Sequence, residues 1–426
     1  MTEDAKPTTD AAHSLRPGLG PGGQSGRWAW PRPTAFWILA GLFLMLFFAS
    51  AAASPLYRVY QAQFHFSAVT LTGVFAVYVL VLLVTLLFCG SVSDYLGRLP
   101  VIITALIFSA VGCVVFLAAH GVGALYAARS MQGIATGLGS GPIGAGLIDL
   151  QPEGSQRAAL ATSAFSNLGL GLGALITSAL IQYAPAPTHL IWWALLAVFA
   201  AGIVTVLAMA EPGSRRAGVL ASLRPRVALP RQARRTFAAA VPCLAAGWAL
   251  AGFYLSLGPS LAAQAAGSPD PLWGGLVIFL LFGAAAVAVL ALRAISARAV
   301  MLAGCLFLCA GMALAFGAIA TTTSAAFIAG AAAAGAGFGL VFLGSFRMIT
   351  ALATPSRRAG VVAAIYIVGY FAFSVPALIA GVATMKFGLH STALVYSASV
   401  AALAATALGI LLLRPGGRSR TSRRSP

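Results

Sequence analysis

Residues 69–98 read VTLTGVFAVYVLVLLVTLLFCGSVSDYLGR, an apolar stretch followed by a short loop. About 20 mostly apolar residues suffice for a helix to cross a membrane. The loop spaces Gly90, Asp94, Gly97 and Arg98 so that glycines, which tolerate tight backbone turns, flank an acid. The stretch therefore predicts a membrane-spanning helix and a turn that leads the chain back into the membrane.

The rest of the chain repeats this composition. Of its 426 residues, 60% are apolar and 8% are charged, whereas a soluble domain has about 25% charged residues. This excludes a soluble enzyme and a disordered chain. Because no alternation of period two appears, the spans are predicted as helices and not as strands of a barrel. We expect twelve of them, near residues 35–57, 69–90, 101–119, 122–148, 158–183, 188–210, 236–261, 272–292, 299–320, 323–347, 360–384 and 390–413.

The positive charge is concentrated in alternate loops. The chain has 26 Lys and Arg against 8 Asp and Glu, a net charge of +18. With a cytoplasmic N-terminus, all of these basic residues except Arg58, Arg129 and Lys386 fall in cytoplasmic loops or tails. This asymmetry follows the positive-inside rule. It predicts a multi-pass protein of the cytoplasmic (plasma) membrane with both termini in the cytoplasm, and it argues against a nucleic-acid partner.

The first and last six spans are related by a shift of 200 residues. The shift aligns Arg98 with Arg298, and several glycines of spans four and five with glycines of spans ten and eleven. Parallel six-helix repeats build one large class of transporters. We expect five parts: a cytoplasmic N-terminal tail without a stable fold (1–34), a six-helix bundle (35–210), a basic cytoplasmic linker (211–235), a second six-helix bundle (236–413) and a basic cytoplasmic tail (414–426).

The loop from Gly90 to Arg98 resembles the signature G-x-x-x-D-x-x-G-R of the major facilitator superfamily. The resemblance covers residues 35–413 and implies the 12-span type. Such a protein is an all-α integral membrane protein of two pseudo-symmetric six-helix bundles, which expose a central site to one side at a time. In the family, the signature Asp latches the cytoplasmic side against the start of span eleven, here Ala359-Gly360. The expected gating residues are Gly90, Asp94, Gly97 and Arg98, joined by Asp149 and Arg157 of the turn after span four, which could equally be solvated loop residues.

Span four carries a charge within the membrane. The segment from Arg129 to Gly133 is similar to the R-x-x-x-G element of the same superfamily. An arginine at mid-depth is disfavoured by roughly 2.5–3.5 kcal/mol, so it normally faces a wet cavity or a partner. Two interpretations stay open: Arg129 recognises substrate or moves protons in a cavity, or it snorkels to the outer interface.

Polar and aromatic side chains within the spans are the candidates for the lining of a substrate cavity. For each of them, packing against a neighbouring helix is an equally good explanation. The candidates are Arg129, Gln132, Asn167, Trp248, Tyr254, Tyr366 and Tyr370.

The energy source is open, because none of the eight acidic residues lies at mid-membrane. A buried carboxylate is the usual proton carrier of such pumps. Protons could couple through Asp94 or Asp149, or the protein could be a uniporter. Span five supplies Gly169 and Gly173 of the G-x-x-x-G-P-x-x-G-G element of proton-coupled exporters, but it has Ala174 in place of the proline.

We expect a secondary active transporter that moves a small organic solute, most simply an antiporter for the efflux of a drug-like or metabolite substrate. A deep arginine and an apolar, aromatic lining favour an amphiphilic or weakly anionic molecule. The alternatives are a uniporter or importer of a sugar-like solute, and a non-transporting receptor or lipid-handling scaffold. No enzyme activity, catalytic residue, metal or cofactor is expected. The expected partners are the substrate and membrane lipid. The chain is expected to be a monomer.

Overall fold

The computed structural model describes residues 30–153, 155, 157–213, 231–352 and 358–413. Within these residues all regular structure is helical. The expectations for most of residues 1–34, for the middle of the linker and for residues 414–426 lie outside the described part of the chain.

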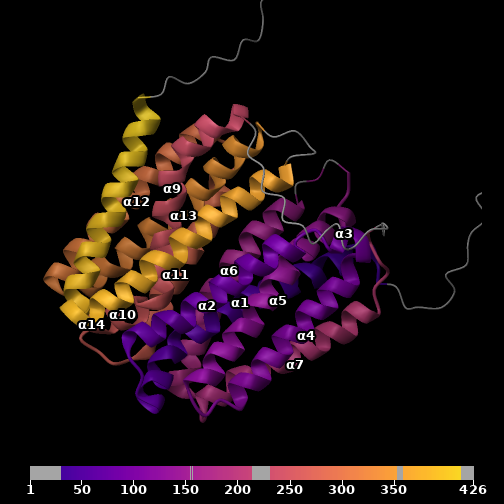
Figure 1. The fold of residues 1–426 in the computed structure, drawn as a ribbon, viewed down its shortest axis with the longest axis horizontal. Helices are drawn as coiled ribbons and strands as arrows, with labels where there is room; N and C mark the ends of the chain where they lie inside the picture. Colours follow the sequence, from indigo (N-terminus) through magenta and orange to yellow (C-terminus); the bar gives the residue numbers. More distant parts are fainter. Residues whose placement is uncertain (1–29, 154, 156, 214–230, 353–357, 414–426) are drawn as a thin grey trace, which may run out of the picture.

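The first half of the chain forms one set of helices, drawn in indigo to magenta in Figure 1. They are α1 (Arg32–Phe64), α2 (Ala68–Cys89), α3 (Ser93–Leu96), α4 (Arg98–Leu117), α5 (Val122–Leu150), α6 (Arg157–Tyr183) and α7 (Pro187–Leu207). The second set, drawn in pink to yellow, lies beside it. It comprises α9 (Arg231–Ser256), α10 (Gly258–Ala266), α11 (Pro271–Ala291), α12 (Ala297–Thr321), α13 (Ser324–Thr350) and α14 (Arg358–Leu413).

The described helices account for the twelve expected spans. By length and composition, ten of them could cross a membrane. A further helix, α5, has 29 residues and carries Arg129 and Gln132. The 56-residue α14 holds two spans, joined at Gly388, where φ is +80°. A positive φ of this size suits glycine and breaks the helix.

Most helices lie within a few residues of the expected boundaries, and two differ more. The first, α1, runs from Arg32 to Phe64 and so extends past the expected 35–57 at both ends. The expected span 236–261 is broken, because α9 ends at Ser256 and α10 begins at Gly258. Pro259 stands in the first turn of α10. Proline lacks the N–H that would continue α9 but fits the first turn of a new helix.

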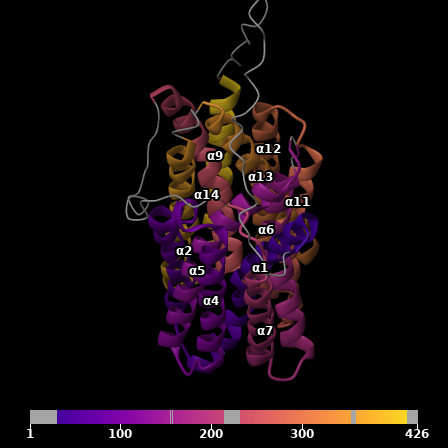
Figure 2. The same ribbon diagram turned by 90° about the vertical axis from the view of Figure 1, so that its right-hand side faces the viewer.

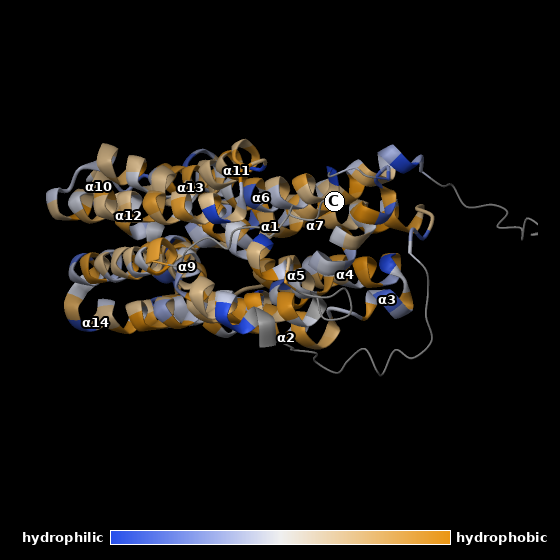
Figure 3. Cartoon of the chain, turned by 90° about the horizontal axis from the view of Figure 1, so that it is seen from above, coloured by the Kyte–Doolittle hydropathy of each residue, from blue (hydrophilic) through white to orange (hydrophobic). Residues whose placement is uncertain are grey.

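The two ends of the bundle are named here after their short helices. Figure 3 shows α3 and α10 at opposite ends, which we call the α3 face and the α10 face. In Figure 2, α6 lies next to α11 on the right and α2 lies next to α14 on the left. The halves meet mainly where α6 packs against α11 and α2 against α14.

Close contacts between the halves lie toward the α10 face. A Cβ added to Gly275 of α11 would meet Ser178 of α6, and one added to Gly381 of α14 would meet Thr72 of α2. Ser54 of α1 donates a hydrogen bond of 2.7 Å to the carbonyl of Leu255 in α9. The two halves therefore approach each other to backbone distance near the α10 face.

Glycines also bring helices together within each half, and this gives a test of the packing. A Cβ on Gly335 of α13 would collide with the carbonyl of Leu281 in α11, whereas one on Gly283 would meet nothing within 4 Å. We expect Gly335→Val to lower the unfolding free energy by about 1–3 kcal/mol or more through overpacking. Thermal unfolding of the purified protein in detergent measures the effect. Gly283→Val is the matched control, and equal stability of the two variants would contradict the packing.

Candidate functional site

The signature loop is ordered at the α3 face by a network around Arg98. Gly97, with φ of +98°, separates α3 from α4. The Arg98 guanidinium forms an ion pair with Asp94, donates a 2.9 Å hydrogen bond to Ser93 Oγ and lies 3.4 Å from the Asp149 carboxylate. The loop after α2 is thus tied to the end of α5. Gly90 caps α2, its N–H donating to the carbonyl of Leu86.

Glu211 joins this network, and the sequence patterns gave it no role. Its carboxylate accepts hydrogen bonds from the backbone N–H groups of Arg98 (2.7 Å) and Leu99 (3.1 Å) at the start of α4. Helix N-termini carry unpaired N–H groups and partial positive charge, so a carboxylate is stabilised there. Glu211 therefore fastens the segment after α7 to the signature loop. Its signal in the sequence was an acid directly behind a span.

The remaining gating residues are placed but not joined into one cluster. Arg157 begins α6 and its side chain is exposed. The described hydrogen bonds and ion pairs of Asp94 connect it to Arg98. The latch between Asp94 and the start of α14 stays a prediction.

Arg129 lies inside the bundle and does not snorkel, because its side chain is only 1% exposed. Its Nη1 donates to the carbonyl of Ser50 in α1 (3.0 Å) and to Gln132 Oε1 (2.7 Å). The guanidinium stacks over the ring of Tyr78 in α2, 4.0 Å from the ring centroid. Such cation–π contacts strengthen when desolvated. Gln132 Nε2 in turn donates to the carbonyl of Ala49 (3.1 Å).

An aromatic cluster, formed by Trp248, Tyr366 and Tyr370, lies between α9 and α14 in the second half of the chain. The indole of Trp248 in α9 lies 4.8 Å from the ring of Tyr370 and 6.4 Å from that of Tyr366, both in edge-on geometry. Gly369 makes this arrangement possible, since a Cβ there would overlap the indole. The approach of the Trp248 ring to α14 therefore depends on the missing side chain at that position.

The contact between α2 and α14 brings the arginine and the aromatic cluster together. The rings of Phe75 and Phe373 lie 5.1 Å apart across this contact. Tyr78 of α2 and Tyr370 of α14 stand one helical turn from these two residues, on the two sides of this contact, and we call them the Tyr78–Tyr370 pair. Arg129 and Trp248 thus lie on either side of the Tyr78–Tyr370 pair, each in contact with one of its rings.

Several polar atoms around this cluster have no partner in the described part of the chain. They are the Tyr57 hydroxyl, Arg129 Nε and Trp248 Nε1, all buried. A buried polar group without a hydrogen bond is costly, so such groups usually bind water or a ligand. The cluster is therefore a candidate for binding a solute with polar groups.

Two of the expected lining residues lie apart from this cluster. The Asn167 amide donates to the carbonyl of Ser163 in its own helix (2.8 Å). The fully buried Tyr254 packs its ring against Phe253 and Phe327. Tyr78 was missed, although it is the one tyrosine of its apolar span. Its stacking on Arg129 depends on how α2 packs against α5, which the sequence of either helix does not fix.

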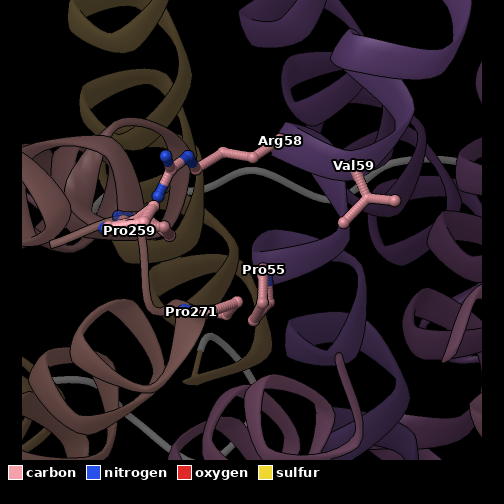
Figure 4. A pocket seen from close by; sticks show the side chains of 6 residues that line it. Pro55, Arg58, Val59, Pro259 and Pro271 are labelled. Carbon is pink, nitrogen blue, oxygen red and sulfur yellow. The ribbon is translucent and has the colours of Figure 1, made fainter. Parts of the chain in front are cut away.

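A small cavity marks the α10 face, where the halves meet. It has a volume of about 200 Å³ and is lined by Pro55, Arg58, Val59, Pro259, Pro269 and Pro271. Figure 4 shows the Arg58 side chain reaching from α1 toward Pro259 of α10. Segments of both halves therefore lie next to each other at the α10 face.

Two helical sets, joined along α2–α14 and α6–α11 around a buried charged and aromatic cluster, define a membrane transporter of the two-bundle kind. Residues 36–298 match the family model of the Major Facilitator Superfamily, which is more than half of the chain. The chain belongs to this superfamily and is a multi-pass membrane transporter, not an enzyme.

A solved structure has the same fold. The crystal structure of a mutant of the nucleoside transporter NupG matches with a TM-score of 0.71 at 12% sequence identity, covering 89% of this chain and 100% of that chain. At this identity the likeness shows the fold alone. No curated protein sequence matches the chain.

Proposed function

We propose that this transporter exports a small amphiphilic or weakly anionic organic molecule, drug-like or a metabolite. The observation that carries the proposal is the placement of the buried Arg129–Tyr78 pair opposite the Trp248–Tyr370 contact. A desolvated guanidinium suits an anionic or hydrogen-bonding group, and aromatic rings suit an apolar or aromatic body. A sugar-like solute would be better served by a cluster of hydroxyl and amide side chains.

The orientation belongs to the same proposal. We place the α3 face in the cytoplasm, because Arg98, Arg157, Arg293 and Arg298 lie at helix ends on that face. This is the pattern of the positive-inside rule. Because the halves are in contact near the α10 face, the described conformation is then inward-facing. We place the protein in the cytoplasmic (plasma) membrane. We further propose that the protein works as a monomer of two rocking six-helix bundles, 35–210 and 236–413.

Coupling to protons is proposed through the carboxylates of the α3 face. Among the described residues, all five acids lie near helix ends or in loops: Asp94, Asp149, Glu153, Glu211 and Asp270. Asp149 shares Arg98 with Asp94. A proton that binds either carboxylate would weaken this network, which would link protonation to movement of the signature loop.

A flux assay with an imposed pH gradient tests the proposal. A panel of anionic aromatic, neutral amphiphilic and sugar-like compounds is offered to proteoliposomes with the α3 face outward and an acidic interior. We expect gradient-driven accumulation of anionic aromatic compounds. Equilibration without accumulation would indicate a uniporter, preferential flux of the sugar-like compounds would reverse the substrate proposal, and no flux of any compound would favour a scaffold.

A further inference from the structure

A second cavity lies at the α3 face, away from the central cluster. Its volume is about 530 Å³, and it is formed where α1 begins, α5 ends and α6 begins. This is the size of typical small-ligand sites. Its charged lining residues are Arg32, Asp149, Glu153 and Arg157. Arg129 and the aromatic cluster do not line it, so the cavity needs a separate explanation.

The cavity offers positive charge to an anion from two helix starts. Arg32 begins α1 and Arg157 begins α6, so the partial positive charge of both N-termini adds to the two guanidinium groups. Arg32 uses one N–H in a 2.9 Å hydrogen bond to the carbonyl of Asp149. The guanidinium of Arg157 has no hydrogen bond or ion pair with any described residue. Forked donors of this kind suit a phosphate.

The same cavity offers negative charge to a cation. Glu153 is exposed and has no ion pair within the described chain, and Asp149 shares its carboxylate with Arg98 at 3.4 Å. Both residues stand at or just beyond the end of α5, where the helix dipole adds partial negative charge. A ligand with one phosphate and one ammonium group would match both sets of charges.

The rim of the cavity is apolar and exposed. Trp37 is 61% exposed and Ile148 is 60% exposed, and both line the cavity. The Trp37 ring is held between Phe36 (5.4 Å) and Phe165 (6.2 Å). Tryptophan is enriched at the headgroup level of membranes. A ligand in this cavity would therefore have its polar part at headgroup depth and an apolar part beside the bundle.

We propose that this cavity binds the headgroup of a membrane phospholipid that carries a phosphate and a primary ammonium group, as in phosphatidylethanolamine. The phosphate lies against Arg32 and Arg157, and the ammonium group donates hydrogen bonds to Glu153. Trp37 and Ile148 contact the lipid where its acyl chains begin. A trimethylated ammonium cannot donate those hydrogen bonds, and a glycerol headgroup lacks the charge.

Lipid binding to the purified full-length chain tests this proposal. The protein in mild detergent is titrated with phosphatidylethanolamine, phosphatidylcholine or phosphatidylglycerol of identical acyl chains, and native mass spectrometry measures the bound lipid. We expect phosphatidylethanolamine to bind about tenfold more tightly than the other two, the worth of one charge-assisted hydrogen bond. Equal binding of the three lipids would overturn the proposal.

Two variants assign the charges. Glu153→Gln is expected to remove the preference for phosphatidylethanolamine. Arg157→Gln is expected to weaken the binding of all three lipids about tenfold. Both side chains are exposed, so the variants keep the fold. Arg293→Gln, at an exposed arginine of the same face in the other half, is the matched control. A preference that survives Glu153→Gln would overturn the headgroup assignment.

The last arm separates a lipid from a free solute. Glycerophosphoethanolamine carries the same headgroup without acyl chains, and we expect it to bind at least about tenfold more weakly, because it lacks the apolar contact at the rim. Equal affinity for this solute would show that the cavity binds a soluble ligand and not a lipid. Because binding and not flux is measured, failure of the proposed transport function leaves this test intact.

Discussion

Oxidation of the double variant Thr72→Cys, Gly381→Cys is expected to reduce transport to the level of empty vesicles, and a reductant is expected to restore it. An added Cβ on Gly381 lies 2.9 Å from the Cβ of Thr72, across the contact of α2 and α14. Disulfides join Cβ atoms about 3.5–4.5 Å apart, so a small separation of the helices accommodates the bond. In the alternating-access cycle that we propose, this α10-face contact opens in every turnover, and the disulfide prevents the opening.

The experiment uses a background in which the five native cysteines are replaced. The transported compound is one identified in the flux panel. The matched control is Gly112→Cys, Met131→Cys, whose Cβ atoms lie 3.4 Å apart on α4 and α5 of the same half. That pair is expected to cross-link without loss of transport. Full transport by the oxidised Thr72–Gly381 pair, with the cross-link verified by mass, would refute an opening of the α10 face between α2 and α14.

Replacement of Arg129 by Ala is expected to weaken the apparent affinity for an anionic substrate about ten- to a hundredfold. A hydrogen bond to a charged group is worth about 1.5–3 kcal/mol, which corresponds to that range. The guanidinium is the one charge beside the Tyr78–Tyr370 pair among the described side chains that contact it. Concentration-dependent uptake by wild-type and variant proteoliposomes measures the effect.

Arg129 also holds α1 through the Ser50 carbonyl, so the assay must separate the two roles. If Arg129 contacts substrate, the variant loses more affinity for an anionic compound than for its neutral analogue. An equal loss for both compounds would show that Arg129 only positions α1. Lys386→Ala, at an exposed basic residue near the α10 face, is the control and should leave uptake unchanged.

The fold was predictable because its signals are local. The stretch at residues 69–98 carries enough apolar length for one span and a turn with glycine where φ is +98°. Similar stretches along the chain, with basic residues at alternate loops, predicted twelve helices in two sets. In a bilayer only helices and closed barrels satisfy the backbone, so apolar length alone decides much of the architecture. The break before Pro259 was the local signal that was overlooked.

The candidate site was predictable only in part. Arg129 was singled out because a charge within a span is rare and costly. Gln132, Trp248, Tyr366 and Tyr370 were named by residue type, which could not separate them from Tyr254 and Asn167. The structure separates them by contacts: Asn167 bonds its own helix, whereas Trp248 lies against Tyr370.

Residue patterns alone identify this protein as a helical membrane transporter, because apolar length, loop charge and the signature from Gly90 to Arg98 act within single segments. Three contacts are visible only in the folded chain: Tyr78 lies under Arg129, Glu211 caps α4, and Arg32 and Arg157 line one cavity. Each of these contacts joins residues on different helices. The distances between them depend on how the helices pack. Glycines such as Gly369 allow helices to approach closely, and which helix approaches cannot be read from one segment of sequence.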